Sequence, residues 1–253
     1  MTMQRIFFLF FFISLYSCQS SDAFLTKGKE LMREGDFKAA IEYLNKSIEK
    51  NTSNAEAFNS RGVAYYELKQ YSSAHMDFDQ AIKLNSGTYR PYFNRALLYA
   101  AENKLDSALT DYNKAIEIAP DTSDIYLNRG QILVLSNQIP AAIQDFEKAV
   151  KLNENNKLAW YNLGNTYFRE NNFKQATLSF RQSTKLDPQK GKAYYGLGLS
   201  QWNEGEKELG CNNINQALQL GYADAAVAVE QYCKYRNPQN SDCFVYLNCS
   251  IHT

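Results

Sequence analysis

An excess of charge of either sign is absent from this 253-residue sequence, which has 27 Lys and Arg residues and 27 Asp and Glu residues. Without a basic excess, it lacks the electrostatic footprint of a nucleic-acid-binding protein. A long hydrophobic run is also missing, because the main apolar stretch, Ile6 to Leu15, is well short of the roughly 20 residues of a membrane-spanning helix. No low-complexity linker interrupts the chain, so we expect one continuous domain.

Histidine is scarce, since His75 and His252 are the only two. The sequence also lacks a Ser-His-Asp order, a glycine-rich phosphate loop and a Cys-x-x-Cys pair. An enzyme therefore has little support, and we predict no catalytic residue, metal or cofactor. Cys243, Cys249 and His252 are three possible metal ligands without a fourth, so an envelope enzyme or metal protein that uses this tail stays as an alternative.

A period of 34 residues is the clearest feature that the sequence does have. It is most complete between Lys157 and Lys190, where its markers are Trp160, Leu163, Gly164, Tyr167, Ala176, Phe180 and Pro188. An aromatic residue recurs in phase as Phe24, Phe58, Tyr92, Tyr126, Trp160 and Tyr194. Small residues recur at two places, as Gly28, Gly62, Ala96, Gly130, Gly164 and Gly198, and as Ala40, Ala74, Ala108, Ala142, Ala176 and Gly210. Since Gly inside a helix costs about 1 kcal/mol relative to Ala, its recurrence indicates close packing between helices.

This spacing resembles the tetratricopeptide repeat (TPR), a helix-turn-helix unit of 34 residues. The resemblance implies an all-α, right-handed superhelical solenoid of six repeats, followed by a capping helix. The expected repeats are 21–54, 55–88, 89–122, 123–156, 157–190 and 191–224. We expect the capping helix over 225–236 and an irregular, Cys-containing tail over 237–253.

An Arg and an Asp vary together in the repeats. The seventh position is Arg and the twenty-third is Asp in repeats two to four only, as Arg61 and Asp77, Arg95 and Asp111, and Arg129 and Asp145. The planar guanidinium suits a carboxylate, so we predict three structural ion pairs between packed helices.

One face of each first helix is the candidate binding surface. The resemblance implies that this face lines a concave groove that binds a partner peptide or subunit. The residues assigned to the groove are Tyr161, Asn165, Phe168, Tyr195, Leu199, Trp202, Phe93 and Tyr66. We expect those of repeats five and six to form one pocket around Asn165 and Leu199. The alternative, burial of these rings by adjacent helices, stays open.

The amino terminus has the layout of an export signal, with Arg5 before the apolar run. Leu15-Tyr16-Ser17-Cys18 resembles a bacterial lipoprotein box, which implies a signal peptide over 1–17, an acylated (palmitate-bearing) Cys18 and a short tether over 18–20. Gln19, in place of an Asp, favours an outer-membrane lipoprotein facing the periplasm. The alternative is an ordinary cleaved signal with an incidental Cys.

Four cysteines lie near the carboxyl end, where export favours disulfides. Cys211 and Cys233 are equally distant from Tyr222, which marks the turn between the last repeat and the capping helix. Residues at equal distances from a helical turn lie at similar heights, so we predict that Cys211 bonds Cys233 and that Cys243 bonds Cys249.

These features predict a non-enzymatic scaffold, anchored in the bacterial envelope by lipid, that binds a protein or peptide. A narrower alternative is an assembly factor, because anchor, length and repeat number resemble the lipoproteins of type IV pilus or outer-membrane protein biogenesis.

Overall fold

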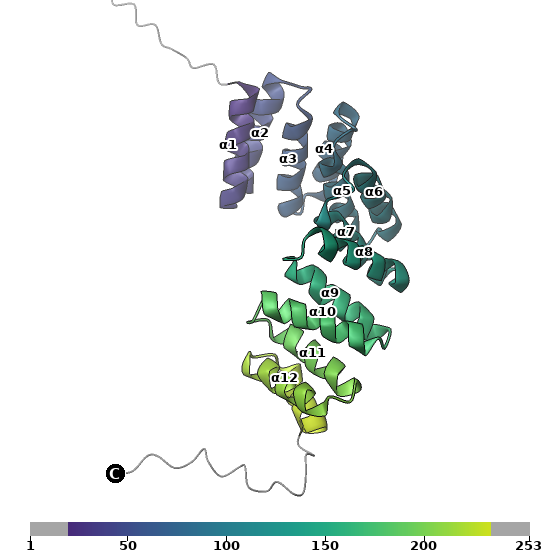
Figure 1. The fold of residues 1–253 in the computed structure, drawn as a ribbon. Helices are drawn as coiled ribbons and strands as arrows, with labels where there is room; N and C mark the ends of the chain where they lie inside the picture. The colour runs from purple at the N-terminus through teal and green to yellow at the C-terminus, as the bar shows by residue number, and fades with distance from the viewer. Residues whose placement is uncertain (1–19, 234–253) are drawn as a thin grey trace, which may run out of the picture. The chain divides into compact units, whose positions relative to one another are not determined.

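The computed structural model describes residues 20–233, and every regular element in this range is a helix (Figure 1). The expected all-α class is confirmed. The chain divides into two compact units, Met1–Asn94 and Arg95–Thr253, where a single continuous domain was expected. Each repeat of a tandem array contacts only its neighbours, so such an array has no single core that must include all repeats.

The helices begin in register with the 34-residue period. The first unit contains α1 (Ser21–Glu34), α2 (Phe37–Lys50), α3 (Ala55–Glu67) and α4 (Tyr71–Leu84), and α5 (Tyr89–Ala101) begins in it. The second unit contains α6 (Leu105–Ile118), α7 (Ser123–Leu135), α8 (Ile139–Leu152), α9 (Lys157–Arg169), α10 (Phe173–Leu186), α11 (Gly191–Asn203) and α12 (Lys207–Gln219). Each expected repeat therefore holds one helical hairpin.

Local sequence explains where the helices start and turn. Asn54 and Asn156 cap α3 and α9, because their side chains accept hydrogen bonds from Ala57 N (3.1 Å) and Ala159 N (3.0 Å). The turn inside each hairpin contains one residue with positive φ, always at the fifteenth position of the repeat. These residues are Gly35, Lys69, Asn103, Asn137, Asn171 and Gly205. Gly and Asn tolerate this left-handed backbone, whereas Lys does so at a cost.

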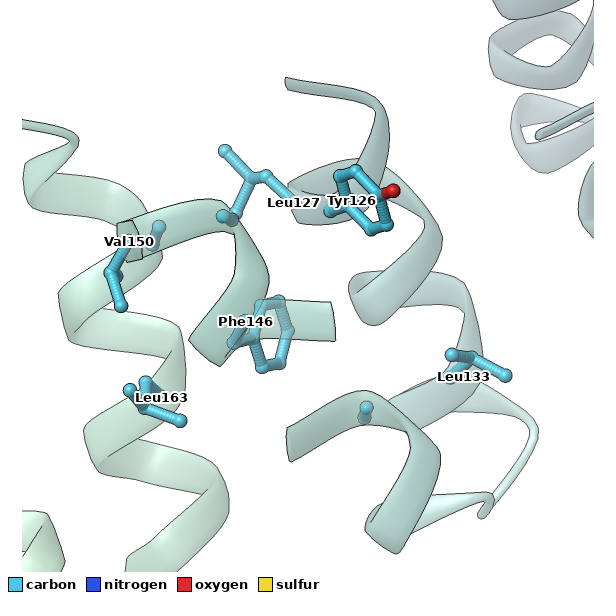
Figure 2. Packing of buried hydrophobic residues seen from close by; sticks show 9 residues of the cluster. Tyr126, Leu127, Leu133, Phe146, Val150 and Leu163 are labelled. Carbon is cyan, nitrogen blue, oxygen red and sulfur yellow. The ribbon is translucent and has the colours of Figure 1, made fainter. Parts of the chain in front are cut away.

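The recurring small residues are sites of close helix contact. A Cβ atom added to Gly62 would lie 2.7 Å from Cε1 of Phe78, and one added to Gly130 would lie 2.7 Å from Cε1 of Phe146. Figure 2 shows Phe146 among Tyr126, Leu133 and Val150 in a buried cluster that Leu163 of the next repeat also joins. The hairpin of repeat four therefore completes its core with a residue of repeat five.

Each Arg of repeats two to four bonds the Asp of the same repeat through two nitrogens. Arg61 donates from Nε to Asp77 Oδ2 (2.8 Å) and from Nη2 to Oδ1 (2.6 Å). The same fork joins Arg95 to Asp111 and Arg129 to Asp145. The Asp side chains are only 5–6% exposed, so each Arg supplies the opposite charge and the hydrogen bonds that a carboxylate buried between helices requires.

The carboxyl-terminal cap differs from the single helix expected over 225–236. A short α-helix, α13 (Asp224–Ala228), is followed by a turn of π-helix, η1 (Val229–Cys233). A disulfide joins Cys211 of α12 to Cys233, with Cα atoms 5.5 Å apart. The cap thus stays beside the last repeat hairpin. In the part of the chain between residues 20 and 233, no helix is long and apolar enough to cross a membrane.

Candidate functional site

One face of α9 carries three of the residues expected in a groove. Leu163 and Gly164 of this helix are buried, whereas Tyr161, Asn165 and Phe168 are half-buried. This difference follows the helical period, since residues three and four apart share a face. The α9 face therefore offers two aromatic rings and one amide for contact with another molecule.

The two rings of α9 rest on the second helix of their own hairpin. Tyr161 packs edge-on against Phe180, with ring centroids 5.9 Å apart, and Phe168 packs in the same way against Phe173 at 5.4 Å. Such packing restricts the rings and so lowers the entropy that a partner must remove on binding. Lys190 adds a positive charge, because its Nζ lies 4.4 Å from the centroid of the Tyr161 ring.

The groove residues of α11 lie under the cap. Tyr195 packs against Tyr222 with ring centroids 5.1 Å apart, and Trp202 packs against Tyr232 at 5.2 Å. Leu199 joins the cluster formed by Ile214, Ala217, Ala225 and Ala228. Of the residues expected to form one pocket around Asn165 and Leu199, those of α11 thus contact the cap, while those of α9 rest on α10. Cap residues lie outside the repeat pattern from which the pocket was expected.

The two other groove candidates belong to the first unit. Tyr66 stacks on Tyr71 with ring centroids 5.9 Å apart, and burial raises the pKa of its hydroxyl. Phe93 is half-buried in α5. In the same unit, a small hollow is lined by Glu56, Asn59, Arg90 and Pro91, among others. Sequence reasoning missed it, because it combines residues of two repeats with the loop between them.

Tyr222 was also missed as a member of the site. Its hydroxyl donates a hydrogen bond to Asp224 Oδ2 (2.7 Å), and this bond, followed by burial, raises the pKa of Tyr222 to about 12. The charges of Asp224, Tyr161 and Tyr195 act in the same direction. Tyr222 thus lies where the α9 face and the capped α11 face meet. The only available signal was its place at the turn after the last repeat.

Several predicted sites cannot be located. Cys18, Cys243, Cys249 and His252 lie outside the described residues, so the lipid anchor, the second disulfide and the tail metal alternative stay predictions. Among residues 20–233, no group of His, Cys, Asp and Glu side chains is arranged to hold a metal ion.

Comparison with known families identifies the repeats. A model described as "TPR repeat" matches residues 28–69, 97–136 and 130–171, and models described as "Tetratricopeptide repeat" match residues 55–88 and 158–190. Together the matches cover more than half of the chain. The chain belongs to the tetratricopeptide repeat family. No curated protein sequence matches it.

Solved structures show the same fold at low sequence identity. PilF of Pseudomonas aeruginosa is 17% identical with a TM-score of 0.74, over 82% of this chain and 97% of PilF. YrrB, described as a TPR protein with an unusual peptide-binding site, is 22% identical with a TM-score of 0.65, over 74% of this chain and 97% of YrrB. A TPR protein from Parabacteroides merdae is 18% identical with a TM-score of 0.62, over 87% and 95%.

Proposed function

We propose that this chain is a non-enzymatic scaffold that binds a segment of another protein on the α9 face. The observation that carries the proposal is the pair of half-buried rings, Tyr161 and Phe168, held in place by Phe180 and Phe173. Aromatic anchors of this kind dominate many interfaces. The TPR fold supports a protein-binding role, and the peptide-binding site described for YrrB is consistent with it.

The test is capture of partners from the native envelope by wild-type protein and by variants. Tyr161→Ala and Phe168→Ala should each weaken capture by about thirtyfold, which corresponds to about 2 kcal/mol at an interface hot spot. Asn165→Lys is a third variant, because it adds a charged side chain to the face without removing a ring contact. Leu178→Ala is the matched control, since Leu178 is 49% exposed on the other helix of the same hairpin.

Stability separates a binding role from a structural one. Trp202→Ala should lower the melting temperature without preventing capture, because Trp202 packs against Tyr232 of the cap. The α9 variants should remain folded by circular dichroism. If Asn165→Lys captures the same partners as wild type, the α9 face is not the binding surface.

The proposal also places the chain at the bacterial envelope, held by lipid on Cys18 and facing the periplasm from the outer membrane. Its support is the lipoprotein-like segment ending at Cys18, followed by Gln19. Cys18→Ser should block maturation or release the protein from the membrane fraction, whereas Cys243→Ser should do neither. Normal cleavage and membrane retention of Cys18→Ser would contradict the anchor.

A narrower role as an assembly factor for an envelope machine is a second proposal. It is supported by the structural similarity to PilF, which extends over 97% of PilF. Deletion of the gene should then reduce a surface filament or the outer-membrane protein content, and a Tyr161→Ala copy should restore it less well than wild type. Full restoration by the variant would separate the assembly role from the α9 face.

A further inference from the structure

Lys190 is the last residue of the fifth repeat and immediately precedes α11. Its carbonyl oxygen accepts a hydrogen bond from Ala193 N (2.9 Å), which fixes the backbone at the start of the helix. The side chain extends to the α9 face, where Nζ lies 4.4 Å from the centroid of the Tyr161 ring. A half-buried ammonium group therefore sits against the face that we propose to bind a partner.

Lys190 forms no ion pair with the described residues, although the Asp187 carboxylate is near enough to affect its pKa. Asp187 Oδ2 is instead paired with Lys157 Nζ, at 2.9 Å. Lys192 adds a further positive charge. Burial is the main cause that lowers the pKa of Lys190. The nearby Asp187 carboxylate raises this pKa, whereas the positive charges of Lys157 and Lys192 lower it further. The ammonium thus loses hydration without gaining an anionic partner.

The Tyr161 ring lies beneath this ammonium, and its hydroxyl forms no hydrogen bond within residues 20–233. The nearby Tyr222 hydroxyl is already committed to Asp224, and the charge of Tyr161 affects its pKa. Tyr195 packs on the other side of the site, against the Tyr222 ring. Gly191 permits this packing, because a Cβ atom there would lie 3.0 Å from Cβ of Tyr222.

An ammonium and a phenol hydroxyl together are donors that suit an anionic oxygen group. The face of the Tyr161 ring offsets only part of the cost of burying the Lys190 charge, whereas an anion would also form an ion pair in a partly desolvated place. We propose that Lys190 and Tyr161 form a subsite for an anionic oxygen group, a carboxylate or a phosphate, carried by the partner segment. This inference rests on the proposed function, because it gives the chemistry of one group in that partner.

The subsite can be tested with small probes before any partner is known. Wild-type protein with ¹³C-labelled Tyr and Lys would be titrated with N-acetyl-aspartate amide, with inorganic phosphate and with the neutral isostere N-acetyl-asparagine amide, while NMR follows the Lys190 and Tyr161 signals. The shifts should saturate with at least one anion and not with the isostere. The two anionic probes distinguish a carboxylate from a phosphate as the preferred group.

Lys190→Gln should weaken probe binding by about tenfold or more. Lys192→Gln is the matched control, because it removes the same charge two residues further along and should change binding by less than about twofold. Equal losses in the two variants would show general charge attraction and overturn the subsite. Equal binding of the neutral isostere, or shifts that do not saturate, would overturn it as well.

Partner capture separates this inference from the proposed function. If Asn165→Lys abolishes capture while Lys190→Gln leaves it unchanged, the proposed function stands and the subsite is overturned. If the anions bind through Lys190 while no α9 variant affects capture, anion binding at Lys190 stands, whereas the partner role of the subsite and the proposed function both fail.

Discussion

Gly164 and Phe180 pack so closely that a Cβ atom added to Gly164 would lie 2.8 Å from Cδ1 of the Phe180 ring. Phe180 also carries the Tyr161 ring of the candidate binding face. The absence of a side chain at Gly164 thus controls both the helix contact in repeat five and the support of that face. A substitution at the buried Gly164 should therefore also displace the Tyr161 ring on the binding face.

Gly164→Ala should destabilise the protein by up to about 2 kcal/mol. Overpacking costs about 1–3 kcal/mol, and the better helix propensity of Ala returns about 1 kcal/mol. Urea unfolding gives the free energy. Phe180→Leu in the Gly164→Ala background should recover part of the loss, because it removes the clashing ring atoms. Additive losses in the double variant would show that the two residues are not coupled.

In the turn of the second repeat, Lys69 adopts a backbone conformation that is unfavourable for Lys. Lys69 has φ of 59°, in the left-handed region that Asn or Gly occupies at the same position of the other repeats. Lys69→Asn and Lys69→Gly should therefore stabilise the protein by about 0.5–1 kcal/mol. Asn171→Lys is the reverse control and should destabilise by a similar amount in thermal unfolding. A stabilising Asn171→Lys would contradict the conformational explanation.

Repeat five has uncharged residues where repeats two to four have the Arg–Asp pair, so the two arrangements can be compared in the same chain. Repeat five has Leu163 and Ser179 at the positions of Arg129 and Asp145. Asp145→Ser alone should cost about 3–5 kcal/mol, because it removes the carboxylate that the partly buried Arg129 binds through two nitrogens. Adding Arg129→Leu should restore most of this loss in chemical denaturation. If the double variant is as unstable as the single one, the ion pair supplies packing that Leu and Ser cannot replace.

The helix register, the close-packed small residues and the Arg–Asp pairs could be predicted because repetition provides internal comparison. Gly62 and Gly130 share one packing role, so each copy supports the assignment of the other. The contacts of Tyr195 and Trp202 with the cap had no such support, since Tyr222 and Tyr232 follow the last repeat. Tyr232 also falls one period after Gly198, where the repeats have Gly or Ala, so the repeat pattern gives no indication of its ring contact.

The strain at Lys69 was missed, although Gly or Asn at the same position of the other repeats indicates a left-handed turn. Cys211 and Cys233 could be paired from the symmetry of the helical turn around Tyr222. The change from the α-helix α13 to the π-helix η1 could not be predicted, because amino-acid composition does not distinguish the two geometries.

Loss of the disulfide should loosen the cap before the rest of the protein. In the chain-entropy model, closing a loop of this length contributes about 3 kcal/mol, and an array spreads a local loss only weakly to distant repeats. The variant with Cys211→Ala and Cys233→Ala should thus show faster hydrogen exchange in α12 and α13, with α7 unchanged as the internal reference. In a Trp160→Phe background, Trp202 fluorescence should shift to longer wavelength, because the ring would lose its contact with Tyr232.

Faster exchange in α7 by the same factor would mean that the second unit unfolds as a whole. Unchanged exchange and fluorescence would mean that the apolar contacts hold the cap without the disulfide.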